Sequence, residues 1–315
     1  GAGRPAAIMA AGGGGWARTA LLATAIVFCG TVVAASAKFI GTRIPAWEQV
    51  LIRSALCILA SPLLGGSGFQ ALRRSQNRRW LFVRGCCGFL GCMCYAAAVQ
   101  KLSLLSVSLV TRMHPLVGPA LVRVLSCERA TPQQVVGYII GVIGLTVGSP
   151  EDTWRATSEA SYGFNYSMAA TLATGISFYC VHRLSRKGED PAAVRAAFHA
   201  SCVFCSLGFG YADPKRLAKA ALPSLPELGA LAVGAAAVTG SQLGLWRLFE
   251  AGELAHAVPG LLLSAVFSAA FDMLLGAGAP SWQELQGSAL VFAAVGLSSL
   301  GAGYPDPEEP AKKEE

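Results

Sequence analysis

The sequence has 315 residues, of which 53% are hydrophobic and only 14% are charged, and its formal net charge is +7. Because soluble domains contain about 25% charged residues, this composition excludes an ordinary soluble protein and indicates a protein embedded in a lipid bilayer. The basic residues lie scattered near the ends of apolar runs, without an aromatic-interleaved patch, which excludes a nucleic-acid-binding surface.

Apolar runs recur along most of the chain and predict ten membrane-spanning helices, since about 20 apolar residues cross the hydrocarbon core. The predicted spans cover residues 17–39, 47–66, 81–100, 105–125, 134–149, 163–182, 192–211, 227–248, 256–275 and 285–303. They leave no room for a soluble catalytic domain, so function must lie between helices. We find no motif for a catalytic nucleophile, a metal site or a phosphate-binding loop, and therefore expect neither an enzyme nor a metal or cofactor.

Two halves of the chain repeat each other. A shift of 150 residues aligns Gln133 with Gln283 and Gly137 with Gly287, and a shift of 146 residues aligns the Arg53 and His199 positions. Because each half holds five spans, an odd number, the second half enters the membrane from the opposite side, as in many secondary transporters. The sequence therefore predicts an all-α integral membrane protein whose ten transmembrane helices form a 5+5 inverted repeat.

The predicted domains and topology follow from this repeat. A flexible N-terminal tail (1–16) precedes the first five-helix repeat (17–149), a connecting loop (150–162), the second five-helix repeat (163–303) and a polar C-terminal tail (304–315). Lys and Arg are about twice as frequent on one side as on the other, so the positive-inside rule predicts that both termini are cytosolic. Lys312 and Lys313 resemble a di-lysine retrieval signal. The expected location is the endoplasmic reticulum or Golgi membrane or the plasma membrane, with the plastid envelope as a third candidate.

Ordered motifs in the first repeat carry a family resemblance. They are Arg84-Gly85, Tyr95-Ala96, "LSLLSV" at 102–107, His114-Pro115 and "CERAT" at 127–131. Through them the segment 84–148 resembles EamA-type proteins of the drug/metabolite transporter superfamily, and in particular solute-carrier 35-like membrane transporters. The resemblance implies a 5+5 inverted-repeat carrier without an ATPase, whose central cavity is lined mainly by spans three, four, eight and nine.

The fourth span carries a permanent cation, Arg112, near its centre. A central arginine costs about 2.5–3.5 kcal/mol on insertion scales, so it normally faces a cavity or a counter-charge. Pro115 and Pro119 on the same span cannot donate backbone hydrogen bonds, and the carbonyl groups left unpaired are tolerated where backbone lines a wet cavity. Two interpretations stay open: Arg112 binds an anionic substrate, or it forms a buried pair with Asp272 or Glu250.

Further polar and aromatic side chains on the spans are candidates for the same site. With Arg112, the candidates for substrate binding are Ser108, Thr111, His114, Tyr95, Arg53, Arg84 and Trp246, and those for a counter-ion or coupling role are Asp272, Glu250 and His256. Five of these candidates also have a structural alternative: helix-to-helix hydrogen bonding for His114, packing for Tyr95 and Trp246, and extension to the membrane interface for Arg53 and Arg84.

Together these expectations define a secondary-active transporter that moves a small metabolite, an organic or phosphorylated anion, by alternating access. One alternative is an exporter of neutral or zwitterionic solutes, such as amino acids or nucleobases, and another is a non-transporting membrane scaffold with the same fold. The expected partners are a small-molecule substrate and the lipid bilayer, with no nucleic acid. A homodimer is a further candidate, because the fifth span has a glycine-rich face that lets helices approach closely, formed by Gly137, Gly141, Gly144 and Gly148.

Overall fold

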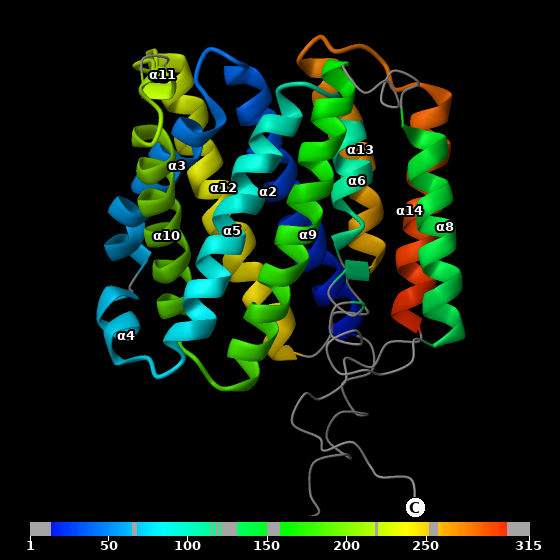
Figure 1. The fold of residues 1–315 in the computed structure, drawn as a ribbon. Coiled ribbons are helices and arrows are strands. Elements are labelled where there is room, and N and C mark those ends of the chain that lie inside the picture. Colours follow the sequence, from blue (N-terminus) through cyan, green and yellow to red (C-terminus); the bar gives the residue numbers. More distant parts are fainter. Residues whose placement is uncertain are drawn as a thin grey trace, which may run out of the picture.

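The computed structural model describes residues 14–64, 68–114, 116–117, 120, 131–149, 158–217, 220–251 and 258–300. All regular secondary structure in these residues is helical, and the long helices stand side by side in a bundle (Figure 1). Among the described residues, four helical stretches have the length and composition of membrane spans, namely Arg18–Ile40, Arg78–Val99, Pro191–Tyr211 and Leu225–Leu248.

The long helices lie where the sequence predicts spans. In the first half of the chain they are α2 (Gly14–Ile40), α3 (Ala46–Ala60), α5 (Arg78–Val99), α6 (Leu104–Thr111) and α8 (Pro132–Gly148). In the second half they are α9 (Glu159–Arg186), α10 (Pro191–Tyr211), α12 (Leu225–Ala251), α13 (Val258–Leu274) and α14 (Trp282–Leu300). Short helices lie between some of them: η1 (Ser61–Leu64), α4 (Gly68–Arg74) and α11 (Pro214–Leu217).

The helix of the fourth predicted span ends earlier than expected. The sequence predicts one span over 105–125, kinked by its prolines, whereas α6 ends at Thr111 and a turn begins at Arg112. The residue at position 115 is a proline, which lacks a backbone N–H and disfavours a helical residue before it. In an unbroken helix the carbonyl oxygen of Thr111 would bond to residue 115. Instead, this oxygen accepts a hydrogen bond from Nδ1 of His114 at 2.6 Å.

Helices α8 and α14 start with the same hydrogen-bond pattern. Thr131 accepts a bond from the Gln134 N–H, and the Gln134 side chain accepts one from the Thr131 N–H. Ser281 and Glu284 form the same reciprocal pair at the start of α14. Such a capping box satisfies two N–H groups that a helix start leaves free. The two boxes lie 150 residues apart, which is the shift of the sequence repeat.

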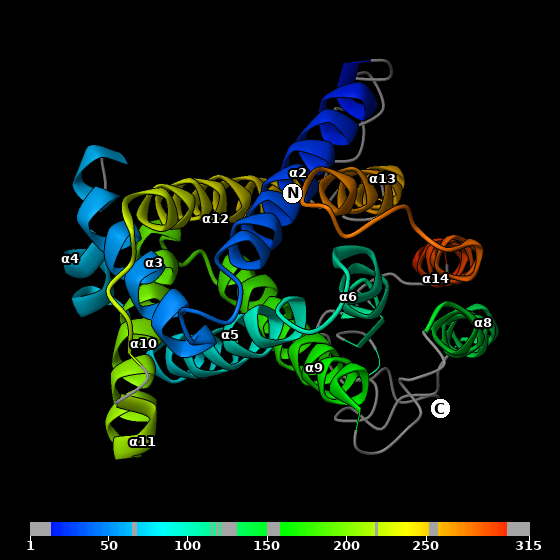
Figure 2. The same ribbon diagram turned by 90° about the horizontal axis from the view of Figure 1, so that it is seen from above.

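Helices from the two halves of the chain interleave rather than form separate lobes. Helix α8 packs on α14, α5 on α9, and α2 on α12, while α10 packs on both α3 and α5. Figure 2 shows α8 and α14 side by side at one edge of the bundle, with α3 and α10 towards the opposite edge. The space between the helices is therefore enclosed by side chains from both halves.

The glycine face of α8 lies against α14 of the same chain. A Cβ atom added at Gly144 would come within 2.9 Å of the Val291 nitrogen, and one added at Gly287 within 2.3 Å of the Gly148 Cα atom. The opposite face of α8 is apolar and exposed, with Ile139 at 55% exposure, as expected for a surface in contact with lipid. A homodimer therefore remains a prediction, and it would have to use a surface other than the glycine face.

Candidate substrate-binding site

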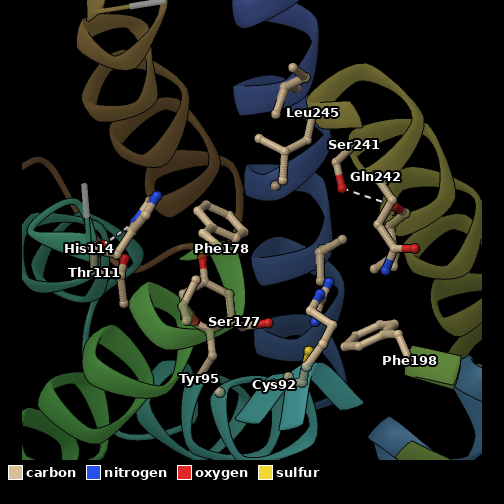
Figure 3. A pocket seen from close by; sticks show the side chains of 18 of the residues that line it. Cys92, Tyr95, Thr111, His114, Ser177, Phe178, Phe198, Ser241, Gln242 and Leu245 are labelled. Atoms are coloured by element: carbon tan, nitrogen blue, oxygen red, sulfur yellow. Dashed lines mark hydrogen bonds between the residues drawn. The ribbon is translucent and has the colours of Figure 1, made fainter. Parts of the chain in front are cut away.

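A cavity of about 240 Å³ lies between the helices. Its described lining residues belong to α2, α3, α5, α9, α10 and α12 and to the end of α6 with the turn that follows (Figure 3). The family resemblance implied spans three, four, eight and nine. The observed cavity also involves spans one, two, six and seven, and none of its described lining residues belongs to α13.

The cavity brings together six of the eight predicted substrate-binding residues, which are Arg53, Arg84, Tyr95, Thr111, Arg112 and His114. The other two, Ser108 and Trp246, are buried outside its lining. The Trp246 side chain packs in a hydrophobic cluster with Leu81 and Val181, which agrees with the packing alternative for this residue. Residues from three predicted spans, the second, third and fourth, thus meet at one place in the fold.

Arg53 and Arg84 do not extend to a membrane interface. Each is only 6% exposed, and the guanidinium carbon of Arg84 lies 4.5 Å from the centre of the Phe198 ring. Such stacking stabilises a cation on an aromatic face. Gly88, one turn further along α5, leaves room for this pair, because a Cβ atom there would come within 2.4 Å of an Arg84 nitrogen. The Phe198 ring on α10 and the space beside Gly88 therefore hold the Arg84 side chain inside the bundle.

The three arginines of the cavity have no acidic partner within it. No carboxylate is among the described lining residues. The Nε groups of Arg84 and Arg112 are buried and have no hydrogen-bond acceptor in the described part of the chain. Cations held in a low-dielectric interior without a counter-ion are unfavourable and attract anions. The charge of this cavity is therefore suited to a negatively charged ligand.

His114 has a structural role as well as a place in the cavity wall. Its Nδ1 bonds the Thr111 carbonyl oxygen, and since a carbonyl can only accept, Nδ1 carries the proton. The ring also makes an edge-to-face contact with Phe178, with 4.8 Å between the ring centres. The proton on Nδ1 leaves Nε2 as an acceptor when the ring is neutral.

The proposed pair between Arg112 and Asp272 does not form. The two carboxylate oxygens of Asp272 accept hydrogen bonds from the N–H groups of Leu104 and Leu105, each at 2.9 Å. They cap the start of α6, whereas Arg112 follows its end. Asp272 binds there because the first turn of a helix leaves N–H groups free and attracts negative charge. The Glu250 side chain and His256 lie outside the described residues.

Loss of this cap should destabilise the bundle. We expect Asp272→Ala to lower the free energy of unfolding by about 1–3 kcal/mol, since it leaves two buried N–H groups unsatisfied. Thermal unfolding of the purified protein in detergent measures the change. Asp272→Asn keeps one acceptor oxygen and should be destabilised less. Equal stability of wild type and Asp272→Ala would contradict the capping role.

Several lining residues were missed at the sequence level, and they come mostly from the second half. They include Thr174, Ser177, Phe178, Phe198, Ser241 and Gln242, and Figure 3 shows Phe178 and Gln242 among the side chains around the cavity. The repeat could have identified one of them. Gln242 lies 17 residues after the start of α12, as Tyr95 lies 17 residues after the start of α5.

The helical bundle, with its apolar spans, is the architecture of an integral, multi-pass membrane protein. Residues 17–148 match the EamA-like transporter family, a match that is consistent with the drug/metabolite transporter superfamily. A crystal structure with 22% sequence identity has the same fold, with a TM-score of 0.61 over 90% of this chain and 97% of its own. A search of curated proteins finds no match.

Proposed function

We propose that the protein is a secondary-active transporter that moves a small organic or phosphorylated anion by alternating access. The observation that carries this proposal is the set of arginines that line the cavity: Arg53 and Arg84, which are buried, and Arg112, which is partly exposed. A neutral solute would leave these charges uncompensated, whereas an anion neutralises them and supplies acceptors for their free N–H groups.

An inverted repeat of ten spans accounts for the way the two halves pack. If the two halves are exchanged, the contact of α5 with α9 becomes that of α12 with α2. In the same way, the contact of α10 with α5 becomes that of α3 with α12, and all four contacts are present. The glycine contacts follow the same rule. A Cβ atom at Gly137 would meet Ser298, and one at Gly287 would meet Gly148. The repeat shift of 150 residues relates Gly137 to Gly287 and Gly148 to Ser298, so the two contacts are equivalent.

Alternating access is supported by the closed end of the cavity near Lys38. Beyond the cavity, the space between α2, α5 and α6 is filled by a buried cluster that includes Ala34, Ala98, Val99, Leu104 and Val107. Lys38 donates a hydrogen bond to the Leu102 carbonyl oxygen, and the Gln100 amide donates one to the Gly41 carbonyl oxygen at 2.7 Å. A substrate could pass this end only after these contacts separate.

The orientation proposed from the charge distribution puts both termini in the cytosol and Lys38 on the opposite side. The membrane proposed is that of the endoplasmic reticulum, the Golgi or the cell surface. Lys312 and Lys313, which suggested retrieval to the endoplasmic reticulum, lie outside the described residues. A glycosylation acceptor added to the C-terminal tail tests the orientation, and its modification in cells would contradict a cytosolic terminus.

Two measurements on the full-length protein test the proposed function. Thermal unfolding in detergent, with a panel of small anions and neutral analogues, is expected to show stabilisation by anions alone. Flux into vesicles that contain the protein is then expected for the stabilising anions. Stabilisation by neutral solutes only would favour the neutral-solute exporter, and an absence of both stabilisation and flux would favour the scaffold.

A further inference from the structure

A group of exposed basic side chains lies outside the cavity lining, at the end of the bundle where α4 leads into α5 and α9 leads into α10. Figure 1 shows the two connecting turns at the same end of the molecule. The members of this group, the basic cluster, are Arg73, Arg74, Arg78, Arg79, Arg186 and Lys187. The first four flank the turn between α4 and α5, and the last two lie at the end of α9. Two distant parts of the sequence therefore contribute to one surface.

Hydrogen bonds to Glu189 hold the two turns together. One carboxylate oxygen of Glu189 accepts a bond from the Ser75 hydroxyl and another from the Asn77 side-chain amide, each at 2.8 Å. The Ser75 hydroxyl also accepts a bond from the Asn77 N–H at 3.0 Å. Because Ser75 is only 7% exposed, water has little access to these bonds. The positions of the basic residues on the two turns are thus fixed relative to each other.

The carboxylates near the basic cluster bind neutral donors rather than its cations. Glu189 accepts from Ser75 and Asn77, and Asp190 caps α10 by accepting a bond from the Ala192 N–H at 2.7 Å. In the described part of the chain, none of five members of the cluster forms an ion pair with a carboxylate, namely Arg73, Arg74, Arg78, Arg79 and Lys187. The surface is therefore strongly positive and suited to an anionic partner.

Apolar side chains next to the cluster place it at the edge of the lipid acyl chains. Residues four apart on a helix lie on the same face. Phe82, which is 68% exposed, follows Arg78 by four positions on α5. Phe69, which is 46% exposed, precedes Arg73 by four positions on α4. Cations beside exposed aromatic rings are typical of the boundary between acyl chains and headgroups, so the partner that fits this surface is a lipid.

We propose that the basic cluster binds the headgroup of a polyphosphorylated anionic phospholipid, such as a phosphatidylinositol bisphosphate, in the leaflet at this end of the bundle. Clusters of Lys and Arg next to a membrane span attract anionic lipids, and guanidinium groups bind phosphate through paired hydrogen bonds. A headgroup with several phosphates can use cations from both turns. Phe69 and Phe82 contact the acyl chains, which a soluble phosphate compound lacks. The positive-inside rule accounts for basic residues at this end, but not for the bonds that join the two turns.

Lipid binding is tested on the purified full-length protein in neutral detergent. Micelles contain phosphatidylcholine alone, or phosphatidylcholine with phosphatidylserine or phosphatidylinositol bisphosphate at equal total charge. Native mass spectrometry measures the lipid retained, and thermal unfolding measures stabilisation. The bisphosphate lipid is expected to be retained most and to stabilise most. Soluble inositol trisphosphate is expected to bind at least about tenfold more weakly, because it makes no acyl-chain contacts.

Variants matched in charge locate the site. Arg78→Gln should lower the affinity for the bisphosphate lipid about fivefold, and a second change, Lys187→Gln on the other turn, should lower it further. Arg78→Lys keeps the charge and should retain most of the affinity. Arg18→Gln removes an exposed cation from the start of α2, which Figure 2 shows away from α4, and it should bind as wild type does.

Variants of Glu189 test the fixed position of the two turns. Glu189→Ala removes the acceptor that both turns share, and it should reduce the preference for the bisphosphate lipid over phosphatidylserine. Glu189→Gln keeps an acceptor oxygen and should keep this preference.

Several outcomes would overturn the lipid site. Equal retention of the bisphosphate lipid and phosphatidylcholine would show that the cluster selects no anionic lipid. Equal losses in Arg78→Gln and Arg18→Gln would leave only a general attraction to negative charge. Inositol trisphosphate that binds as tightly as the lipid would exclude a lipid as the ligand. All of these results are independent of the proposed transport function, which anion flux tests.

Discussion

Arg112→Ala is expected to lower anion affinity and transport at least about tenfold, because one charge-assisted contact to a ligand is worth about 1.5–3 kcal/mol. The protein should remain folded and correctly inserted. No described carboxylate is paired with Arg112, so its removal strands no acid in the membrane. On insertion scales, loss of a central arginine even relieves about 2.5–3.5 kcal/mol. Vesicle flux measures transport, and thermal unfolding with and without anion measures binding and stability.

The stability of Asp272 variants distinguishes a substrate-binding Arg112 from an Arg112 that forms a structural pair with Asp272. If Arg112 and Asp272 were partners, Arg112→Ala would destabilise the protein and Asp272→Asn would restore it. Because Asp272 bonds Leu104 and Leu105, we expect the double variant to be less stable than Arg112→Ala alone. Full transport by the double variant would rule out Arg112 as a substrate contact. His114→Ala is the companion variant, and it should weaken transport less than Arg112→Ala.

Gly287→Ala is expected to cause the largest loss of stability among single-methyl changes. The added Cβ atom would lie 2.3 Å from the Gly148 Cα atom and 2.6 Å from the Gly144 carbonyl oxygen. Both neighbours are backbone atoms that cannot rotate away, so α8 and α14 must move apart. Overpacking of this kind typically costs 1–3 kcal/mol and occasionally more. Thermal unfolding in detergent measures the loss, and Gly287→Leu should enlarge it.

Gly208→Ala is the matched control for this prediction. It makes the same chemical change inside α10, where an added Cβ atom meets no atom within 4 Å. Alanine is a better helix former than glycine by about 1 kcal/mol, so this variant should be as stable as wild type or slightly more stable. If Gly287→Ala and Gly208→Ala have equal stability, the close approach of α8 and α14 is wrong.

The amino-acid sequence alone determined the helical class and the approximate position of each long helix. Apolar length and composition are local properties, and they identify segments such as Pro191–Tyr211 without knowledge of their neighbours. The caps that start α8 and α14 are equally local, because residues three apart in the sequence form them. A permanent cation in an apolar segment is also visible in the sequence, which is why Arg112 could be singled out before the fold was known.

The tertiary structure decided which side chains meet. The sequence suggested Asp272 as a partner of Arg112, but Asp272 bonds the first N–H groups of α6. It placed Arg84 near an interface, but an aromatic ring on α10 holds that side chain inside the bundle. Contacts such as that between Arg84 and Phe198 join residues far apart in the chain. Their distance depends on how the helices pack, and no local pattern of residues encodes it.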